Sequence, residues 1–144
     1  MKILVIHGPN LNMLGQREES QYGVLTMTQI DNLMATSFPK HAFTFFQSNI
    51  EGDIITQLQG ASGSFDAIII NPGGYAHSSV AIRDALILCK MPKIEVHLSN
   101  IASREDFRHR SLTAAACDGY ISGFREHSYL AGVFLLEQRW GTNK

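Results

Sequence analysis

The sequence lacks the features that mark secreted, membrane-spanning or nucleic-acid-binding proteins. It has only two cysteines, Cys89 and Cys117, without CxxC spacing, so buried reduced thiols are expected rather than a disulfide or a metal site. Its formal net charge is −1 and its basic residues are scattered, which gives no electrostatic footprint for nucleic acid or an acidic membrane. The N-terminal apolar run Ile3–Ile6 is too short for a signal peptide or a membrane span. These absences predict a cytoplasmic protein with a small-molecule or protein partner.

The composition is that of an ordinary globular domain. The 144 residues are 44% hydrophobic and 17% charged, which argues against disorder and permits one hydrophobic core. No internal repeat, low-complexity tract or linker rich in proline and glycine divides the chain. We therefore expect residues 1–144 to form a single domain.

Short apolar runs alternate with segments of helical periodicity, the pattern of βα units that feed a parallel sheet. The run Ala67–Ile70 is apolar throughout, as expected of a central strand covered on both faces. We predict an α/β fold, a flavodoxin-like three-layer sandwich with five parallel strands in the order 2-1-3-4-5. The expected strands are Ile3–Ile6, Phe43–Gln47, Ala67–Ile70, Ile94–Leu98 and Tyr120–Ser122.

Capping signals and apolar stripes predict the helices. Thr26 and Gln29 have capping-box spacing at the start of the first helix, and Ser103 and Asp106 could cap a later one. A third helix should run from about Ser78 to Leu88. Apolar stripes complete the pattern, with Ile54, Ile55 and Leu58 in a helix ending near Gly60 or Gly63, and Tyr129, Val133, Leu136 and Trp140 in the last helix.

The predicted strand order places a ligand between the first and third strands, because open parallel sheets bind ligands where the chain reverses its winding. The segments His7–Gly23 and Asn71–His77 should flank that place, with the end of the fourth strand nearby. The turn after the third strand carries Gly73 and Gly74, but it lacks the Walker lysine and the three-glycine dinucleotide pattern. Phosphate or NAD binding is therefore disfavoured.

The long connection after the first strand offers an amide at Asn10, a cation at Arg17 and a phenol at Tyr22. A tyrosine titrates near about 10, so it serves as a base near neutrality only if its phenolate is stabilised. A guanidinium supplies that stabilisation, and Arg17 can reach Tyr22 if the loop folds back. The alternative is a tyrosine packed against the body of the protein and an arginine in solvent.

The fourth strand places Glu95, His97 and Ser99 on one face at period two. A carboxylate beside an imidazole favours the imidazolium, which can donate a proton to a leaving group. The alternative is an edge strand that faces water. Arg104 and Arg108 follow at a spacing that, if helical, presents both guanidiniums on one side, either toward a ligand or as a solvated face.

These segments together resemble the type II dehydroquinase family, which dehydrates 3-dehydroquinate to 3-dehydroshikimate. The resemblance runs in order through nearly the whole chain. It rests on five co-linear motifs: Gly8–Gly15 with Arg17-Glu18 and Tyr22-Gly23, then Gln47–Asn49 with Glu51-Gly52, Asn71–His77 with Arg83–Ala85, Glu95–Asn100, and Arg104–Arg108.

The resemblance implies roles for these residues. Tyr22 takes a proton from the carbon beside the ketone, Arg17 stabilises the phenolate and the transition state, and Asn10 positions a water that stabilises the enolate. His97, oriented by Glu95, protonates the departing hydroxyl. The residues implied to hold the ring are Asn71, His77, Leu98, Ser99 and Arg108.

The resemblance also implies an assembly and a pathway. Asp84 should contact the site of an adjoining subunit in a dodecamer built from trimers, with no metal, nucleotide or Schiff base. The step belongs to the shikimate pathway of aromatic amino acid biosynthesis, and also to quinate catabolism. The sequence departs from the family pattern at Glu19, Ile50 and Arg125, which bear on the lid and on subunit contacts more than on the reaction.

Two alternatives stay open from the sequence. One is a flavodoxin-like binding module without catalysis, against which the Arg17, Tyr22, Glu95 and His97 set argues. The other is a metal-dependent hydrolase that uses His7, His77 and His97, although no HxH or HExxH spacing supports it.

Overall fold

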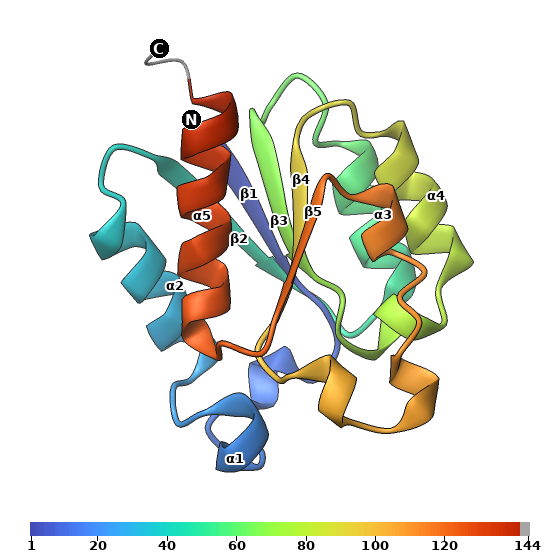
Figure 1. Cartoon of the computed structure of the whole chain (residues 1–144). Coiled ribbons are helices and arrows are strands. Elements are labelled where there is room, and N and C mark those ends of the chain that lie inside the picture. The colour runs from blue at the N-terminus through green and yellow to red at the C-terminus, as the bar shows by residue number, and fades with distance from the viewer. Residues whose placement is uncertain (142–144) are drawn as a thin grey trace.

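The computed structural model describes residues 1–141, and a parallel sheet of five strands forms its centre (Figure 1). The strands pair in the order β2-β1-β3-β4-β5, and each pairing is parallel. The predicted fold class and strand order are confirmed, with strand ends that differ slightly from those expected. The strands are β1 (Lys2–His7), β2 (Ala42–Gln47), β3 (Ala67–Asn71), β4 (Lys93–His97) and β5 (Gly119–Ser122).

Helices cover both faces of the sheet, so the molecule has three layers (Figure 1). Thr26 caps its helix as predicted, because its hydroxyl accepts from the Gln29 N–H while the Gln29 side chain accepts from the Thr26 N–H. No helix within residues 1–141 combines the length and hydropathy that a bilayer crossing requires. One face carries α2 (Met27–Ser37) and α5 (Glu126–Trp140), the other α3 (Glu51–Gln59) and α4 (Val80–Leu88), and α1 (Glu19–Tyr22) lies in the connection after β1.

Alternate residues of each central strand fill two separate cores. In β3, Ala67 and Ile69 pack toward α2 and α5, whereas Ile68 and Ile70 pack toward α3 and α4. All four are fully buried, as predicted for a strand covered on both faces. Each such isoleucine contributes about 1.5–3 kcal/mol through removal of its side chain from water. This two-sided packing fixes the strand ends that carry the polar residues of the site.

Both cysteines have free thiols and belong to the core beneath α3 and α4 or its border. Cys89 is buried and Cys117 is half-buried. Desolvation by burial raises the pKa of both thiols above the usual value. Each thiol therefore stays protonated at neutral pH.

The helix predicted to start at Ser103 does not form, so that prediction is wrong. The segment makes two separate 3-10 turns, η3 (Ile101–Ser103) and η4 (Asp106–Arg108), with extended backbone at Arg104 and Glu105 between them. The Ser103 hydroxyl donates back to the Asn100 carbonyl oxygen instead of accepting from a later N–H. The Arg104 guanidinium bonds to Ser99, and this contact holds the segment against the strand end. The Ile101 N–H also donates to the Ser122 hydroxyl at 3.0 Å, so a tertiary contact overrides the local capping pattern.

Candidate active site

A cavity of about 100 Å³ lies at the carboxyl ends of β1, β3 and β4, at the predicted switch point. The segments that follow these three strands come together at this end of the sheet (Figure 1). Glu95 lies behind His97, whereas Asp84 is exposed on α4 and does not line the cavity. The other predicted site residues all line it: Asn10, Arg17, Tyr22, Asn71, His77, His97, Leu98, Ser99 and Arg108.

Two glycines allow the turns after β1 and β3 to approach closely. The Gly8 N–H donates to the Asn71 carbonyl oxygen at 2.7 Å, and a Cβ at Gly8 would lie 2.5 Å from the Pro72 carbonyl carbon. Gly73 has φ of +60°, and a Cβ there would lie 2.9 Å from the Pro9 oxygen. Side chains at these positions would therefore separate the two walls of the cavity.

Tyr22 and Arg17 form a direct pair beside the cavity. The Arg17 Nη2 donates to the Tyr22 hydroxyl oxygen at 2.7 Å, and its Cζ lies 3.7 Å from the ring centroid. Tyr22 is only 6% exposed, so little water competes for this contact. A guanidinium in that position stabilises negative charge on the oxygen. The predicted folding back of the loop is confirmed. The alternative is correct that Tyr22 packs against the body of the protein but wrong that Arg17 lies in solvent.

Arg104 is a cavity residue that the sequence left undecided between a ligand-facing and a solvated role. Its Nη1 donates to the Ser99 hydroxyl at 3.2 Å, and its Cζ lies 5.4 Å from the Tyr22 ring centroid. Its Nε is buried and has no hydrogen-bond partner within residues 1–141. Arg104 therefore adds a second positive charge near the Tyr22 ring.

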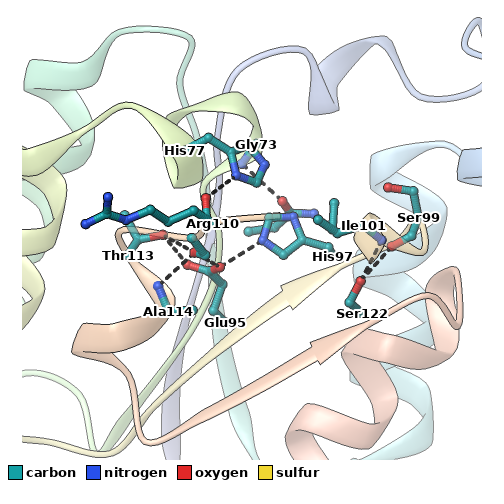
Figure 2. Close-up of polar contacts among 12 residues, drawn as sticks. Gly73, His77, Glu95, His97, Ser99, Ile101, Arg110, Thr113, Ala114 and Ser122 are labelled. Atoms are coloured by element: carbon teal, nitrogen blue, oxygen red, sulfur yellow. Dashed lines mark hydrogen bonds and ion pairs between the residues drawn. The ribbon is translucent and has the colours of Figure 1, made fainter. Parts of the chain in front are cut away.

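Glu95 and His97 form a buried pair on the polar face of β4. The His97 Nε2 lies 2.9 Å from the Glu95 Oε2, to which it donates (Figure 2). Glu95 is wholly buried and His97 is 5% exposed, and β4 lies between β3 and β5. The interpretation of β4 as an edge strand facing water is therefore wrong. Within residues 1–141, no protein group bonds to His97 Nδ1, which leaves that nitrogen for a ligand.

Two further residues, Ser111 and Thr113, complete the hydrogen bonding of the Glu95 carboxylate. The sequence did not predict either of them as a site residue. Ser111 Oγ donates to Glu95 Oε2 at 3.0 Å. Thr113 Oγ1 donates to Glu95 Oε1 (Figure 2). With the His97 bond, three donors compensate a carboxylate that has lost its water. The sequence indicates these two donors only indirectly, because a buried glutamate requires hydrogen-bond donors from elsewhere in the chain.

Residues that can hold a polar ring surround the two pairs. The His77 Nδ1 donates to the Arg110 carbonyl oxygen at 2.9 Å, which leaves Nε2 for a ligand (Figure 2). Arg108 Nε donates to Glu105 Oε2 at 2.6 Å, and its side chain is still part of the cavity wall. Hydrogen bonds from the backbone N–H of Glu105 and then from Arg108 lower the pKa of the exposed Glu105 carboxyl.

The three histidines of the metal-hydrolase interpretation do not form a cluster. His7 contacts Asp31 and Tyr129, whereas His77 and His97 have ring centroids 6.4 Å apart and contact other groups. Across residues 1–141, no group of three histidine, cysteine, aspartate or glutamate side chains has the geometry to hold a metal ion. The described geometry therefore gives no support to that interpretation.

Comparison with known proteins agrees with this geometry. The model of the family described as dehydroquinase class II matches residues 1–136. A 3-dehydroquinate dehydratase of Aliarcobacter butzleri is 49% identical over 140 residues, 96% of this chain and 85% of that protein. A 3-dehydroquinate dehydratase of Helicobacter acinonychis is 52% identical over 135 residues, 90% of this chain and 80% of that protein.

Solved structures show the same similarity in three dimensions. A type II dehydroquinase from Butyrivibrio crossotus superposes with a TM-score of 0.92 at 44% identity, covering 95% of this chain and 97% of that one. A type II dehydroquinase from Propionibacterium acnes gives a TM-score of 0.91 at 34% identity, with 95% and 96% covered. The chain belongs to the type II dehydroquinase family.

Proposed function

We propose that this chain is a 3-dehydroquinate dehydratase, a hydro-lyase that converts 3-dehydroquinate to 3-dehydroshikimate and water. One observation carries the proposal: the Arg17–Tyr22 pair and the Glu95–His97 pair flank a single cavity. The Arg17–Tyr22 pair suits the removal of a proton from the substrate, and the Glu95–His97 pair suits the delivery of another proton to the leaving group. Membership of the family, and relatives that carry the name 3-dehydroquinate dehydratase, support the same reaction.

The first step removes a proton from the carbon beside the ketone. The Tyr22 phenolate takes that proton, and the electrons of the C–H bond move onto the ketone oxygen to form an enolate. Arg17 stabilises the phenolate before the transfer through its contact at 2.7 Å. Asn10 lines the cavity and positions the water that stabilises the enolate oxygen.

The second step expels the hydroxyl group as the enolate returns to a ketone. His97 protonates the leaving oxygen, so water departs and a conjugated double bond remains. Glu95 orients the imidazole through its contact with Nε2 and stabilises the imidazolium before transfer. Protein groups supply each proton donor and acceptor, so the mechanism uses no cofactor.

The remaining cavity residues hold the substrate ring. Arg108 and His77 contact its hydroxyl groups, and Asn71 offers its side-chain amide from the end of β3. The substrate carboxylate lies against the Leu98–Ser99 backbone and the Ser99 hydroxyl, near Arg104. This assignment places the positive charge of the cavity beside the negative charge of the substrate.

An absorbance assay tests the proposal, because the conjugated product absorbs ultraviolet light much more strongly than the substrate. Purified protein treated with chelator should produce absorbance growth from 3-dehydroquinate. Tyr22→Phe and His97→Ala should each lower kcat by about 100-fold or more while still binding the ring. A folded wild-type chain that produces no absorbance growth would refute the proposed function. Near-wild-type turnover in either variant would refute that residue's role.

We also propose that the chain acts as one catalytic domain in a cytoplasmic dodecamer built from trimers. Asp84 is exposed on α4, close in sequence to the exposed apolar residues Val80, Ile87 and Leu88. Such a surface suits a subunit contact through which Asp84 reaches a neighbouring site. Asp84→Ala should weaken substrate binding in the assembled protein. An active monomer with unchanged affinity, measured with light scattering and steady-state kinetics, would contradict this arrangement.

A further inference from the structure

A buried chain of hydrogen bonds runs from the cavity into the core beneath α2 and α5. It joins Asn71 to Tyr129, Tyr129 to His7, and His7 to Asp31. We propose that Tyr129, His7 and Asp31 are positioning residues. They hold the Asn71 side-chain amide in one orientation, so that its NH2 group donates to the substrate ring. The inference rests on the proposed function for the identity of the ring and on the contacts below for the positioning.

The orientation of the Asn71 amide follows from its neighbour in the turn after β3. The Gly73 N–H can only donate, so the side-chain atom 3.1 Å from it is the oxygen Oδ1. Nδ2 then lies 3.1 Å from the Tyr129 hydroxyl oxygen, to which it donates. Asn71 is 3% exposed, so water does not replace either contact.

The proton positions on His7 can be deduced from the partners of the Tyr129 hydroxyl. Tyr129 is fully buried, and within residues 1–141 its hydroxyl has only two partners, Asn71 Nδ2 and His7 Nδ1 at 3.0 Å. Because Asn71 donates to it, Tyr129 must donate to His7 Nδ1. A proton on that nitrogen would leave the Tyr129 O–H buried without an acceptor.

His7 is therefore a neutral imidazole with its proton on Nε2. That nitrogen donates to Asp31 Oδ1 at 2.7 Å, and His7 is 1% exposed. Each bond in the chain has one donor and one acceptor, so donation runs in one direction, from Asn71 through Tyr129 and His7 to Asp31. Asp31 selects the tautomer, His7 orients the Tyr129 hydroxyl, and Tyr129 holds the Asn71 amide.

The network acts on the reaction through a residue of the cavity wall. His7 and Asn71 are paired across the ends of β1 and β3, so the chain of bonds is anchored in the sheet. Asn71 keeps one amide proton and one oxygen lone pair for a ligand. Without Tyr129 only the Gly73 contact orients the amide, which can then rotate and present the wrong group to the ring. Ground-state binding should weaken more than the chemical step slows.

Kinetics of matched variants test the positioning. His7→Leu and Tyr129→Phe should each raise KM by about tenfold with kcat changed less than about threefold, the size expected for one lost hydrogen bond. Asp31→Asn should have a smaller effect than His7→Leu, because its amide oxygen still accepts from Nε2. His41→Leu is the control, since His41 also pairs with a carboxylate, Glu137 at 3.7 Å, and does not line the cavity. Equal changes of KM in His7→Leu and His41→Leu would overturn the proposal.

A nuclear magnetic resonance measurement tests the proton positions without any activity. Long-range ¹H–¹⁵N spectra of histidine-labelled wild-type protein at pH 7 should show His7 protonated at Nε2 alone. A doubly protonated His7, or a proton on Nδ1, would overturn the network even if His7→Leu failed to fold. A wild-type chain with the expected tautomer and no dehydratase activity would instead refute the proposed function.

Discussion

The guanidinium of Arg17 contacts Tyr22 in two ways, with Nη2 2.7 Å from the hydroxyl oxygen and Cζ 3.7 Å from the ring centroid. The first contact stabilises charge on the oxygen and the second holds the ring in place. Lysine carries the same charge but lacks the planar fork that makes both contacts at once. The pair therefore depends on arginine geometry as well as on positive charge.

Arg17→Leu should lower kcat by about 100-fold, because Tyr22 loses the charge that stabilises its phenolate. Arg17→Lys should lie between the wild type and Arg17→Leu, since it restores charge without the planar contact. Steady-state kinetics across pH check the cause, and the rate of Arg17→Leu should recover as the pH rises. A rate deficit that stays constant with pH would show that Arg17 acts by another route.

Thr113→Val should destabilise the protein by about 1–3 kcal/mol, because the variant removes one donor from the buried Glu95 carboxylate. It should also lower kcat, since Glu95 holds His97. Urea unfolding measures the free energy. Thr36→Val is the matched control because Thr36 is exposed and, among residues 1–141, its hydroxyl bonds only to carbonyls of its own helix. The control should change the free energy by less than about 0.5 kcal/mol. Equal losses in both variants would contradict the role of Thr113.

The sequence predicted those parts of the fold and site that depend on local pattern. The apolar run Ala67–Ile70 predicts a strand buried on both faces, and the Thr26 capping box predicts the start of a helix. Both depend only on neighbouring residues, and the structure confirms both. The period-two placement of Glu95 and His97 also survives, because a strand fixes side-chain direction.

The parts that the sequence did not predict depend on contacts between distant segments. Thr113 lies 18 positions from Glu95, and nothing in its neighbours marks it as a donor. Ser103 has the spacing of a capping residue, but its hydroxyl donates to the Asn100 carbonyl oxygen, and the Ile101 N–H donates to the Ser122 hydroxyl, 21 positions away. From the sequence, His7 was a candidate only for a metal ligand. Its hydrogen-bond partners Asp31 and Tyr129 come from two different helices, so no local pattern predicts them.

The protein should lose stability at alkaline pH because of its buried acids. Desolvation by burial raises the pKa of the Tyr129 hydroxyl and of the Cys117 thiol above their usual values. Above about pH 9 for the thiol and about pH 10 for the phenol, the unfolded chain has released protons that the folded chain still holds. The unfolded state then binds fewer protons, so the free energy of unfolding falls as pH rises, by at most about 1.4 kcal/mol per pH unit for each group.

Urea unfolding at a series of pH values measures that slope. The series should run from about pH 8 to about pH 11, which covers both ionisations. Tyr129→Phe should flatten the slope, even though its lost hydrogen bonds lower stability at every pH. A slope in Tyr129→Phe equal to that of the wild type would show that the buried phenol does not contribute.

Arg125→Gly should stabilise the protein, because Arg125 has φ of +51° and ψ of −136°, a region that favours glycine. The exposed Arg125 side chain has no hydrogen bond or ion pair within residues 1–141 that offsets the strain. The gain should be about 1 kcal/mol by urea unfolding, after the extra backbone entropy of glycine is subtracted. Arg125→Ala separates the two causes, since it removes the same side chain but keeps the strained backbone. Stabilisation of both variants by equal amounts would assign the effect to the arginine side chain, and stabilisation of Arg125→Gly alone would assign it to the backbone.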